Sequence, residues 1–146
     1  DFTGTSLDGQ VFTYTQPGTY LPIATITDAQ GNRFTAQAMV QVVDVAALDA
    51  SLRAKWTALK DALRAGDIPR ALIQIAVTSR PAYDEAFRII AAQLPQIDSI
   101  LTDIVSPEVR EGEAFYEALR TDAGVAKSFE VRFIVDVDGV WRVDAF

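Results

Sequence analysis

The sequence predicts a mixed α+β chain: about three strands of an incomplete β-sandwich, followed by three to four helices packed on a four-stranded antiparallel meander. The apolar spacing changes along the 146 residues in a way that leads to this prediction. Apolar residues alternate with a period of two up to residue 44, recur with a helical period after residue 46, and alternate again from residue 103. These changes predict two domains, 1–45 and 46–146.

The first domain is predicted to contain strands at 10–15, 19–28 and 33–44. In the second and third of these strands, alternate apolar residues share one face: Tyr20, Pro22, Ala24, Ile26, Phe34, Ala36, Ala38, Val40 and Val42. Gly31 and Asn32 lie between the two strands and tolerate positive φ, as a hairpin turn requires. Residues 19–44 are therefore expected to form a hairpin with one apolar face.

This first domain is too small to cover its own apolar face, and a bare face of that kind is unfavourable in water. Two explanations remain open. The covering strands belong to an earlier part of a longer polypeptide, or another chain supplies them by adding strands to the open edge.

The helices follow directly. Leu48, Leu52, Trp56, Leu59 and Leu63 form the stripe of a first helix. Gly66 is predicted to end this helix in a left-handed conformation, and Asp67 and Ser79 are predicted to cap the next two. The third helix has an apolar stripe that ends where Pro95 breaks the helix: Tyr83, Phe87, Ile90 and Leu94. The isoleucines at 97, 100 and 104 predict a short further helix.

Four strands are predicted near 103–109, 113–121, 127–136 and 140–146. The last hairpin admits two registers. A three-residue loop, Val137–Gly139, pairs Asp136 with Val140 and buries more apolar surface than a two-residue turn does, because a one-residue slip inverts the strand. We expect the three-residue loop, with Gly139 left-handed and Arg132 paired with Asp144.

The stretch "FTYTQPGTYLPIATITDAQGNRFTAQAMVQVV" resembles the C-terminal part of a PKD-type immunoglobulin-like domain. The matching features are "PGTY", a strand ending in "TD", a Gly/Asn turn and a final Thr/Val-rich strand. The opening "DFTG" resembles that family's "DFGDG" stretch, but Thr3 and Thr5 stand where further acidic residues are common. The resemblance implies an incomplete Ig-like sandwich and an exported, extracellular or surface-attached bacterial protein.

The second domain resembles the nuclear-transport-factor-like (cystatin-like) α+β folds through its order of elements and its ending "DGVWRVDAF". The stretch from "KWTALKDALRAGDIPRAL" to "LPQI" is similar to an uncharacterised helical module of bacterial surface proteins. In such folds, a pocket between helices and sheet often holds a small molecule.

Composition excludes several functions. The chain has no cysteine and no histidine, which rules out disulfides, thiol nucleophiles, imidazole or thiolate zinc sites and histidine-based triads. Its net charge of −7 argues against binding nucleic acid through phosphates. No apolar run is long enough to predict membrane insertion. No phosphate-binding loop or carboxylate dyad is present, so no cofactor, metal or catalytic residue is predicted.

A ligand pocket is predicted from three aromatic residues, Trp56, Tyr83 and Tyr116, although each also fits ordinary core packing. The preferred function is non-catalytic: spacing, adhesion or assembly contacts with protein chains or glycans at the cell surface. The first alternative is a small-ligand-binding or enzymatic domain. The second is a filament subunit whose open sandwich is completed by a neighbouring subunit.

Overall fold

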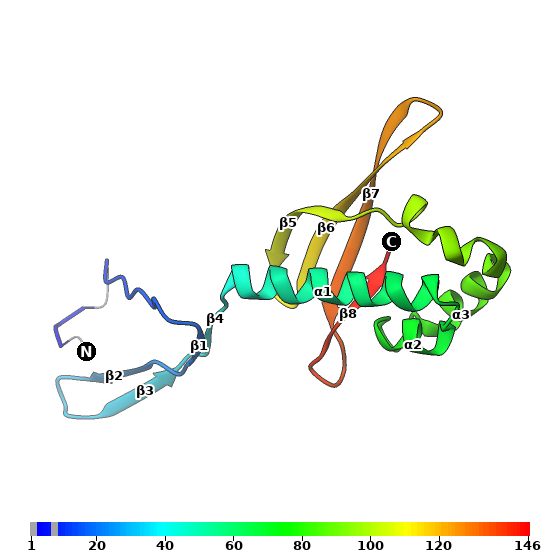
Figure 1. Cartoon of the computed structure of the whole chain (residues 1–146). Coiled ribbons are helices and arrows are strands. Elements are labelled where there is room, and N and C mark those ends of the chain that lie inside the picture. The colour runs from blue at the N-terminus through cyan, green and yellow to red at the C-terminus, as the bar shows by residue number, and fades with distance from the viewer. Residues whose placement is uncertain (1–2, 7–8) are drawn as a thin grey trace. The chain divides into compact units, whose positions relative to one another are not determined.

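A computed structural model describes residues 3–6 and 9–146 of the chain, a mixed α+β protein with small antiparallel sheets (Figure 1). The chain divides into two compact units, Asp1–Asp44 and Val45–Phe146, one residue before the predicted boundary. We call them unit 1 and unit 2. Asp1 and Phe2, which open the "DFTG" stretch, lie outside the described residues, as do Leu7 and Asp8.

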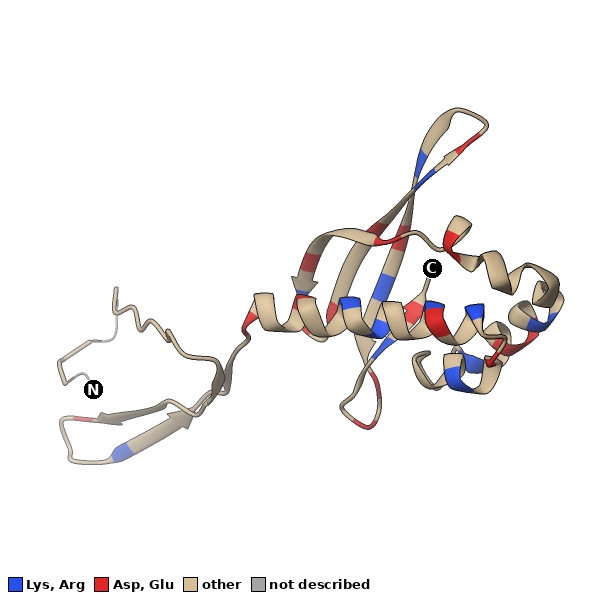
Figure 2. Ribbon diagram, in the orientation of Figure 1, with Lys and Arg blue, Asp and Glu red and all other residues tan. Residues whose placement is uncertain are grey.

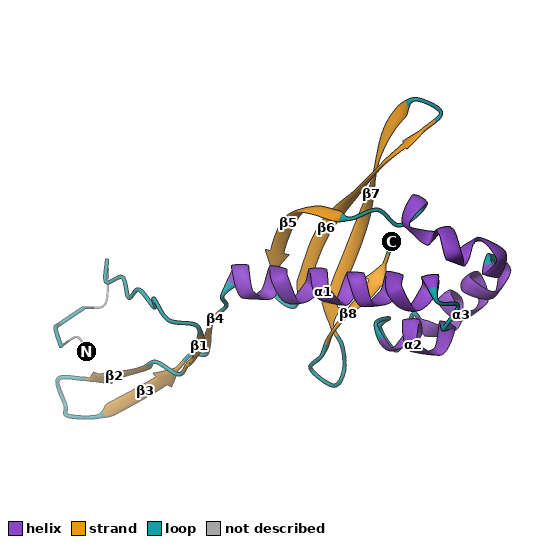
Figure 3. Cartoon of the chain, viewed as in Figure 1, coloured by secondary structure: helices purple, strands orange, loops and turns teal. Residues whose placement is uncertain are grey.

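Unit 1 is a single antiparallel hairpin in which the strand pairing is interrupted once. Its strands are β1 (Gly18–Tyr20), β2 (Ile23–Thr27), β3 (Arg33–Gln37) and β4 (Val40–Val42). β1 pairs with β4 and β2 with β3 (Figure 3). The pairs run in one continuous register from Gly18↔Val42 to Thr27↔Arg33. This register places the two predicted apolar faces on the same side of the hairpin.

Pro22 lies at the interruption of the hairpin. A proline has no N–H to donate, although its carbonyl still accepts a hydrogen bond from Ala38 N at 3.1 Å. The predicted strands 19–28 and 33–44 are therefore each divided in two. At the turn, Gly31 has φ +87° as predicted. Asn32 instead binds the Asp28 carboxylate through its backbone and side-chain N–H groups, both at 2.8 Å.

The predicted strand at 10–15 is wrong, since no strand forms over these residues. Strands need a hydrogen-bonded neighbour, and Val11, which is 86% exposed, has none. The segment is held by tyrosines instead. The Tyr14 and Tyr20 rings lie 4.3 Å apart between centroids, and the Tyr20 hydroxyl donates to Gln16 O at 2.7 Å.

Unit 2 contains one four-stranded antiparallel sheet in the order β5-β6-β7-β8. The strands are β5 (Ile104–Arg110), β6 (Glu113–Asp122), β7 (Val125–Val135) and β8 (Trp141–Ala145). The helices are α1 (Val45–Arg64), α2 (Ile68–Ile73), α3 (Arg80–Ile89) and a 3-10 segment η1 (Ala91–Ser99). Figure 1 shows α1 crossing one face of this sheet, with α2 and α3 at its C-terminal end.

The predicted helix signals hold at two of three positions. Gly66 has φ +71° two residues beyond the end of α1, and the Asp67 carboxylate accepts a hydrogen bond from Arg70 N at 3.1 Å, capping α2. Ser79 occupies the N-cap position of α3 but makes no capping bond, because its hydroxyl donates to Asp144 at 2.8 Å. Ser79 therefore ties α3 to β8 instead.

The third helix is shorter than predicted. It ends at Ile89, and Leu94 and Pro95 lie in the 3-10 segment η1 rather than at the end of an α-helix. Pro95 removes an N–H from the helix interior, and Gln96 next to it leaves helical geometry at φ −110°. The second half of η1 corresponds to the short further helix expected after Pro95, but η1 ends at Ser99, and Ile104, which was predicted to belong to that helix, begins β5 instead.

The predicted register of the last hairpin is confirmed. Asp136 N donates to Val140 O at 3.0 Å, and Phe133 lies opposite Val143. A bulge then shifts Arg132 opposite Ala145, yet its guanidinium still reaches the Asp144 carboxylate, with Nε at 3.1 Å. Gly139 is left-handed, with φ +79°.

Replacing Gly139 with alanine should lower the free energy of unfolding of unit 2 by about 1 kcal/mol, because a Cβ disfavours left-handed backbone. A Cβ built there meets nothing within 4 Å, so the cost is confined to the backbone. Urea denaturation followed by tryptophan fluorescence measures it. Gly139→Asn is the control and should lose less, since asparagine tolerates this conformation. Equal stability of the alanine variant and wild type would refute the strained turn.

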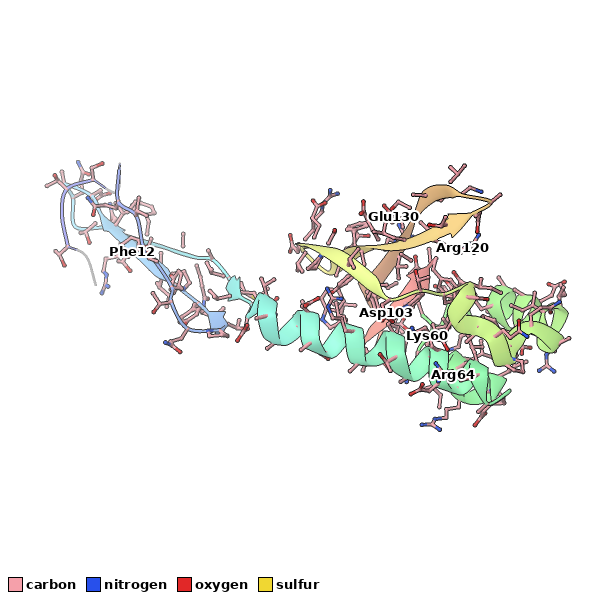
Figure 4. The ribbon with its side chains drawn as sticks, turned by 45° about the horizontal axis from the view of Figure 1, so that its top comes forward. Phe12, Lys60, Arg64, Asp103, Arg120 and Glu130 are labelled. Atoms are coloured by element: carbon pink, nitrogen blue, oxygen red, sulfur yellow. The ribbon has the colours of Figure 1, made fainter. Side chains whose placement is uncertain are left out.

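The core of unit 2 lies between α1 and the sheet. Four of the five predicted residues of the first stripe are buried, and Leu48 packs at the margin. Lys60, also on α1, is buried next to these residues, and its amine contacts Asp103 at 2.6 Å and Asp98 at 3.3 Å (Figure 4). These contacts fix the chain around η1 and the start of β5 against α1.

Candidate functional site

An apolar cavity of about 340 Å³ lies in unit 2, between one face of β6 and β7 and the segments α3 and η1. Aromatic and aliphatic side chains dominate its lining: Trp56, Tyr83, Ala86, Phe87, Ile90, Ile97, Ile100, Leu101, Ala118, Arg120, Phe129, Val131 and Phe146. Two residues of the predicted pocket, Trp56 and Tyr83, belong to this wall.

Trp56, on α1, lines the cavity in a fixed position. It is 1% exposed, because the periodicity of α1 turns it toward the sheet. Its indole N–H donates to Thr102 O at 2.8 Å, and the Phe146 ring meets it edge-on at 5.3 Å. With its only donor already bound, Trp56 offers the cavity an apolar surface alone.

Tyr83 stands on the helical wall, stacked on Phe146 with ring centroids 4.7 Å apart. Its hydroxyl oxygen accepts a hydrogen bond from Phe146 N at 3.0 Å. No described residue accepts the phenolic proton, so this O–H is available as a donor. Burial raises the pKa of Tyr83, which keeps the phenol protonated at neutral pH.

Arg120 is the only charged residue of the lining. Its Nε and Nη2 bind the two Asp122 oxygens, both at 2.8 Å, and its guanidinium lies 4.7 Å from the centroid of the Phe129 ring. Lys127 is its cross-strand partner and also contacts Asp122, at 3.3 Å. Arg120 and Lys127 thus share one carboxylate near the cavity, on the hairpin of β6 and β7 where Figure 4 labels Arg120.

Tyr116 does not line this cavity. It lies on the same face of β6 as Ala118 but under the first turns of α1, where its hydroxyl donates to Asp49 at 2.9 Å. Burial, followed by the Asp49 carboxylate, raises the pKa of Tyr116. Arg53 completes the group by binding Asp49 at 2.9 Å. The three-residue pocket predicted from sequence is thus divided between two places.

Of the lining residues that the sequence analysis did not assign to a pocket, Arg120 and Phe146 matter most, because they supply the charge and the C-terminal ring. Arg120 follows Tyr116 and Ala118 at alternate positions of β6, so strand periodicity could have placed it on that face. Phe146 lies beyond the last strand, where no periodic signal exists.

A second recess, of about 310 Å³, lies over the outer face of β5, β6 and β7. Its lining is mostly polar: Ser106, Glu108, Phe115, Tyr116, Glu117, Ser128 and Glu130. Glu117 and Glu130 are direct cross-strand partners, an arrangement that like charges disfavour. Within residues 3–6 and 9–146, no group of acidic side chains has the geometry to hold a metal ion.

Unit 1 presents a third candidate surface, the apolar face of the hairpin. Ile26 and Phe34 lie opposite one another on this face, and each is 59% exposed. No described residue of unit 1 is buried. Charges are sparse here compared with unit 2 (Figure 2). The hairpin therefore exposes apolar side chains that would ordinarily be covered in a folded sandwich.

Both edges of the hairpin are also open. Asp28 N donates to Asn32 O, and Ala38 N to Pro22 O. Because hydrogen-bonded pairs alternate along an antiparallel ladder, the backbone groups of Ile23, Thr25 and Thr27 point away from β3. Neither two-stranded sheet has a further strand among the described residues. Such edges accept additional strands.

No family model, no curated protein and no solved structure matches the chain. Across the described residues, every helix is too short or too polar to cross a membrane.

Proposed function

We propose that this chain is a non-catalytic interaction module of an exported bacterial surface protein. In this proposal, unit 1 is the C-terminal part of a PKD-type immunoglobulin-like sandwich, and strands from outside these residues complete it. Unit 2 is a nuclear-transport-factor-like domain, the folded domain to which unit 1 is joined in the chain. The partners are protein chains or glycans at the cell surface, and the surface location rests on the resemblance of the quoted motifs.

One observation carries the proposal: the uncovered apolar face of unit 1. Ile26 and Phe34 each leave more than half of their surface to water, and they are flanked by open strand edges. Burying apolar surface stabilises by roughly 25 cal/mol per Å², so strands that cover this face gain both apolar burial and backbone hydrogen bonds.

Tyr20 supports the immunoglobulin-like assignment of unit 1. A tyrosine near the start of a strand, whose hydroxyl bonds the backbone a few residues upstream, forms the tyrosine corner of immunoglobulin-like sandwiches. Tyr20 is the third residue of the first arm of the hairpin, which β1 begins and β2 continues, and its hydroxyl donates to Gln16 O, four residues upstream. In complete sandwiches this corner precedes a strand that pairs on both of its edges.

The polar groups of unit 2 support a structural role. Asp49, Asp98 and Asp122 each bind an arginine or lysine. Such pairing orders neighbouring elements and leaves these carboxylates engaged with cations rather than with a substrate. Within the proposal, unit 2 therefore acts as a platform.

Hydrogen exchange combined with sedimentation velocity tests the proposal on the 146-residue chain. We expect the amides of Ile23, Thr25 and Thr27 to exchange rapidly in the monomer, because their N–H groups point away from β3. If a neighbouring copy completes the sandwich, these amides become protected only in the associated species. If the parent polypeptide completes it, the chain stays monomeric and the amides stay unprotected.

The matched variant is Ile26→Thr with Phe34→Thr, which makes the hairpin face polar and leaves unit 2 unchanged. It should abolish any concentration-dependent association, whereas the pair Leu119→Thr and Val125→Thr, exposed on unit 2, should not. Slow exchange at Ile23, Thr25 and Thr27 in a monomeric chain would refute the proposal, because the hairpin would then be covered by its own chain.

A further inference from the structure

We infer that the apolar cavity of unit 2 is a binding site for a small amphiphile, with an apolar body and a single negatively charged head such as a carboxylate. This inference concerns unit 2 alone and does not depend on the function proposed for the hairpin of unit 1.

The size and lining of the cavity define the apolar body. Its volume of about 340 Å³ lies at the lower end of the roughly 300–1,000 Å³ range of ligand pockets. An apolar recess of this size leaves aliphatic and aromatic surface in contact with water unless a ligand covers it. Water gains little there, because aliphatic and aromatic groups form most of the wall.

The wall is also preformed. Trp56 is held by its bond to Thr102 O, and Tyr83 by the amide of Phe146. Phe87 is 2% exposed, with its ring centroid 5.7 Å from that of Tyr83. Because these rings are fixed before a ligand arrives, binding costs little side-chain entropy.

The polar groups of the cavity select the head. The lining contains no acidic side chain, and the polar side chains that remain available, Arg120 and Tyr83, are both hydrogen-bond donors. Asp122 takes up Nε and Nη2 of Arg120, which leaves Nη1 for another acceptor. Lys127 shares the same carboxylate, so a positive charge is left in excess. An anionic acceptor complements both donors.

Titrations with three eight-carbon probes test the inference: sodium octanoate, 1-octanol and octylammonium chloride, each below its micelle-forming concentration. The chain has two tryptophans, and only Trp56 lines the cavity, so the two indole N–H signals in an NMR spectrum report binding with an internal reference. Octanoate should shift the Trp56 signal and leave that of Trp141 in place. It should bind about tenfold more tightly than octanol, as expected for one hydrogen bond to a charged group.

Three variants locate the site. Ala86→Phe places a ring at an exposed position of the lining and should abolish the octanoate shift, with the circular dichroism of the chain unchanged. Arg120→Gln should remove the preference for octanoate over octanol. Lys127→Gln is the matched control. It also removes one positive charge that pairs with Asp122, but Lys127 lies outside the lining, so the preference for octanoate should persist.

Four results would overturn the inference. They are no shift of the Trp56 indole signal with octanoate, octylammonium binding as tightly as octanoate, unchanged binding to Ala86→Phe, or an equal loss of preference in Arg120→Gln and Lys127→Gln. The first and third reject the cavity as a site, and the second and fourth reject an anionic head read by Arg120.

Discussion

Replacing Phe133 with alanine is expected to lower the free energy of unfolding of unit 2 by about 4 kcal/mol. Phe133 lies in β7 at 0% exposure, opposite Ala114 on one neighbouring strand and Val143 on the other. Its ring also meets Tyr116 edge-on, with centroids 5.6 Å apart. The change loses apolar burial and leaves a void beneath α1 that neighbouring strands cannot close.

Phe34→Ala provides the matched control, because it is the same substitution in unit 1 at 59% exposure. It should change the free energy of unfolding of unit 2 by less than about 0.5 kcal/mol. Urea denaturation followed by tryptophan fluorescence measures both variants, and both tryptophans belong to unit 2. Similar losses in the two variants would contradict the assignment of the core to unit 2.

Unit 2 is expected to lose stability as pH falls from about 4 toward 2. Two carboxylates of the last hairpin, Asp136 and Asp138, contribute to this loss, and Arg142 is the cation that they share. Asp136 accepts hydrogen bonds from Val77 N at 2.9 Å and Val137 N at 2.8 Å, and Arg142 binds both Asp136 and Asp138. These contacts lower the pKa of Asp136, chiefly through the two backbone N–H groups. Arg142 and the Val140 amide lower the pKa of Asp138 to about 2.

The direction of this pH effect on stability follows from a comparison with the ordinary aspartate pKa of 3.8. Because the folded-state pKa values lie below it, both carboxylates stabilise the fold at higher pH, and this contribution disappears as pH falls through the folded-state values. Thermal unfolding by circular dichroism between pH 2 and 6 measures it. Asp136→Asn should be less stable at pH 6 and show a shallower decline in acid. Glu111→Gln, a control at an exposed turn, should lose stability in acid as wild type does. If the stability of Asp136→Asn declines as steeply as that of wild type, Asp136 is not a cause of the acid sensitivity.

Local signals in the sequence predicted much of unit 2. The stripe of α1 follows from helical periodicity, Gly66 and Asp67 mark helix ends by their own chemistry, and the last hairpin follows from which register buries more apolar surface. Each of these features depends on residues that are near in sequence, so one sequence suffices to predict it.

The errors arose where structure depends on distant partners. A strand at 10–15 needs a neighbour, and none pairs with it among the described residues. Tyr116 fits a pocket by its type, yet the Asp49 carboxylate, 67 residues away, holds it elsewhere. The sequence analysis assigned Asp136 only a position opposite Val140, whereas its carboxylate also accepts a hydrogen bond from Val77 N, 59 residues away. Such contacts leave no periodic trace in the sequence.

The continuous register of unit 1 makes Thr25 and Thr35 direct neighbours. They form a pair that is not hydrogen-bonded, the kind whose Cα atoms approach to about 4.5 Å, a separation that a disulfide can span. Because the chain has no cysteine, a crosslink engineered between these two threonines would be the only one in the protein. Oxidation alone would then join the two strands of unit 1 covalently, so that the binding of added strands is measured on a hairpin whose register is fixed.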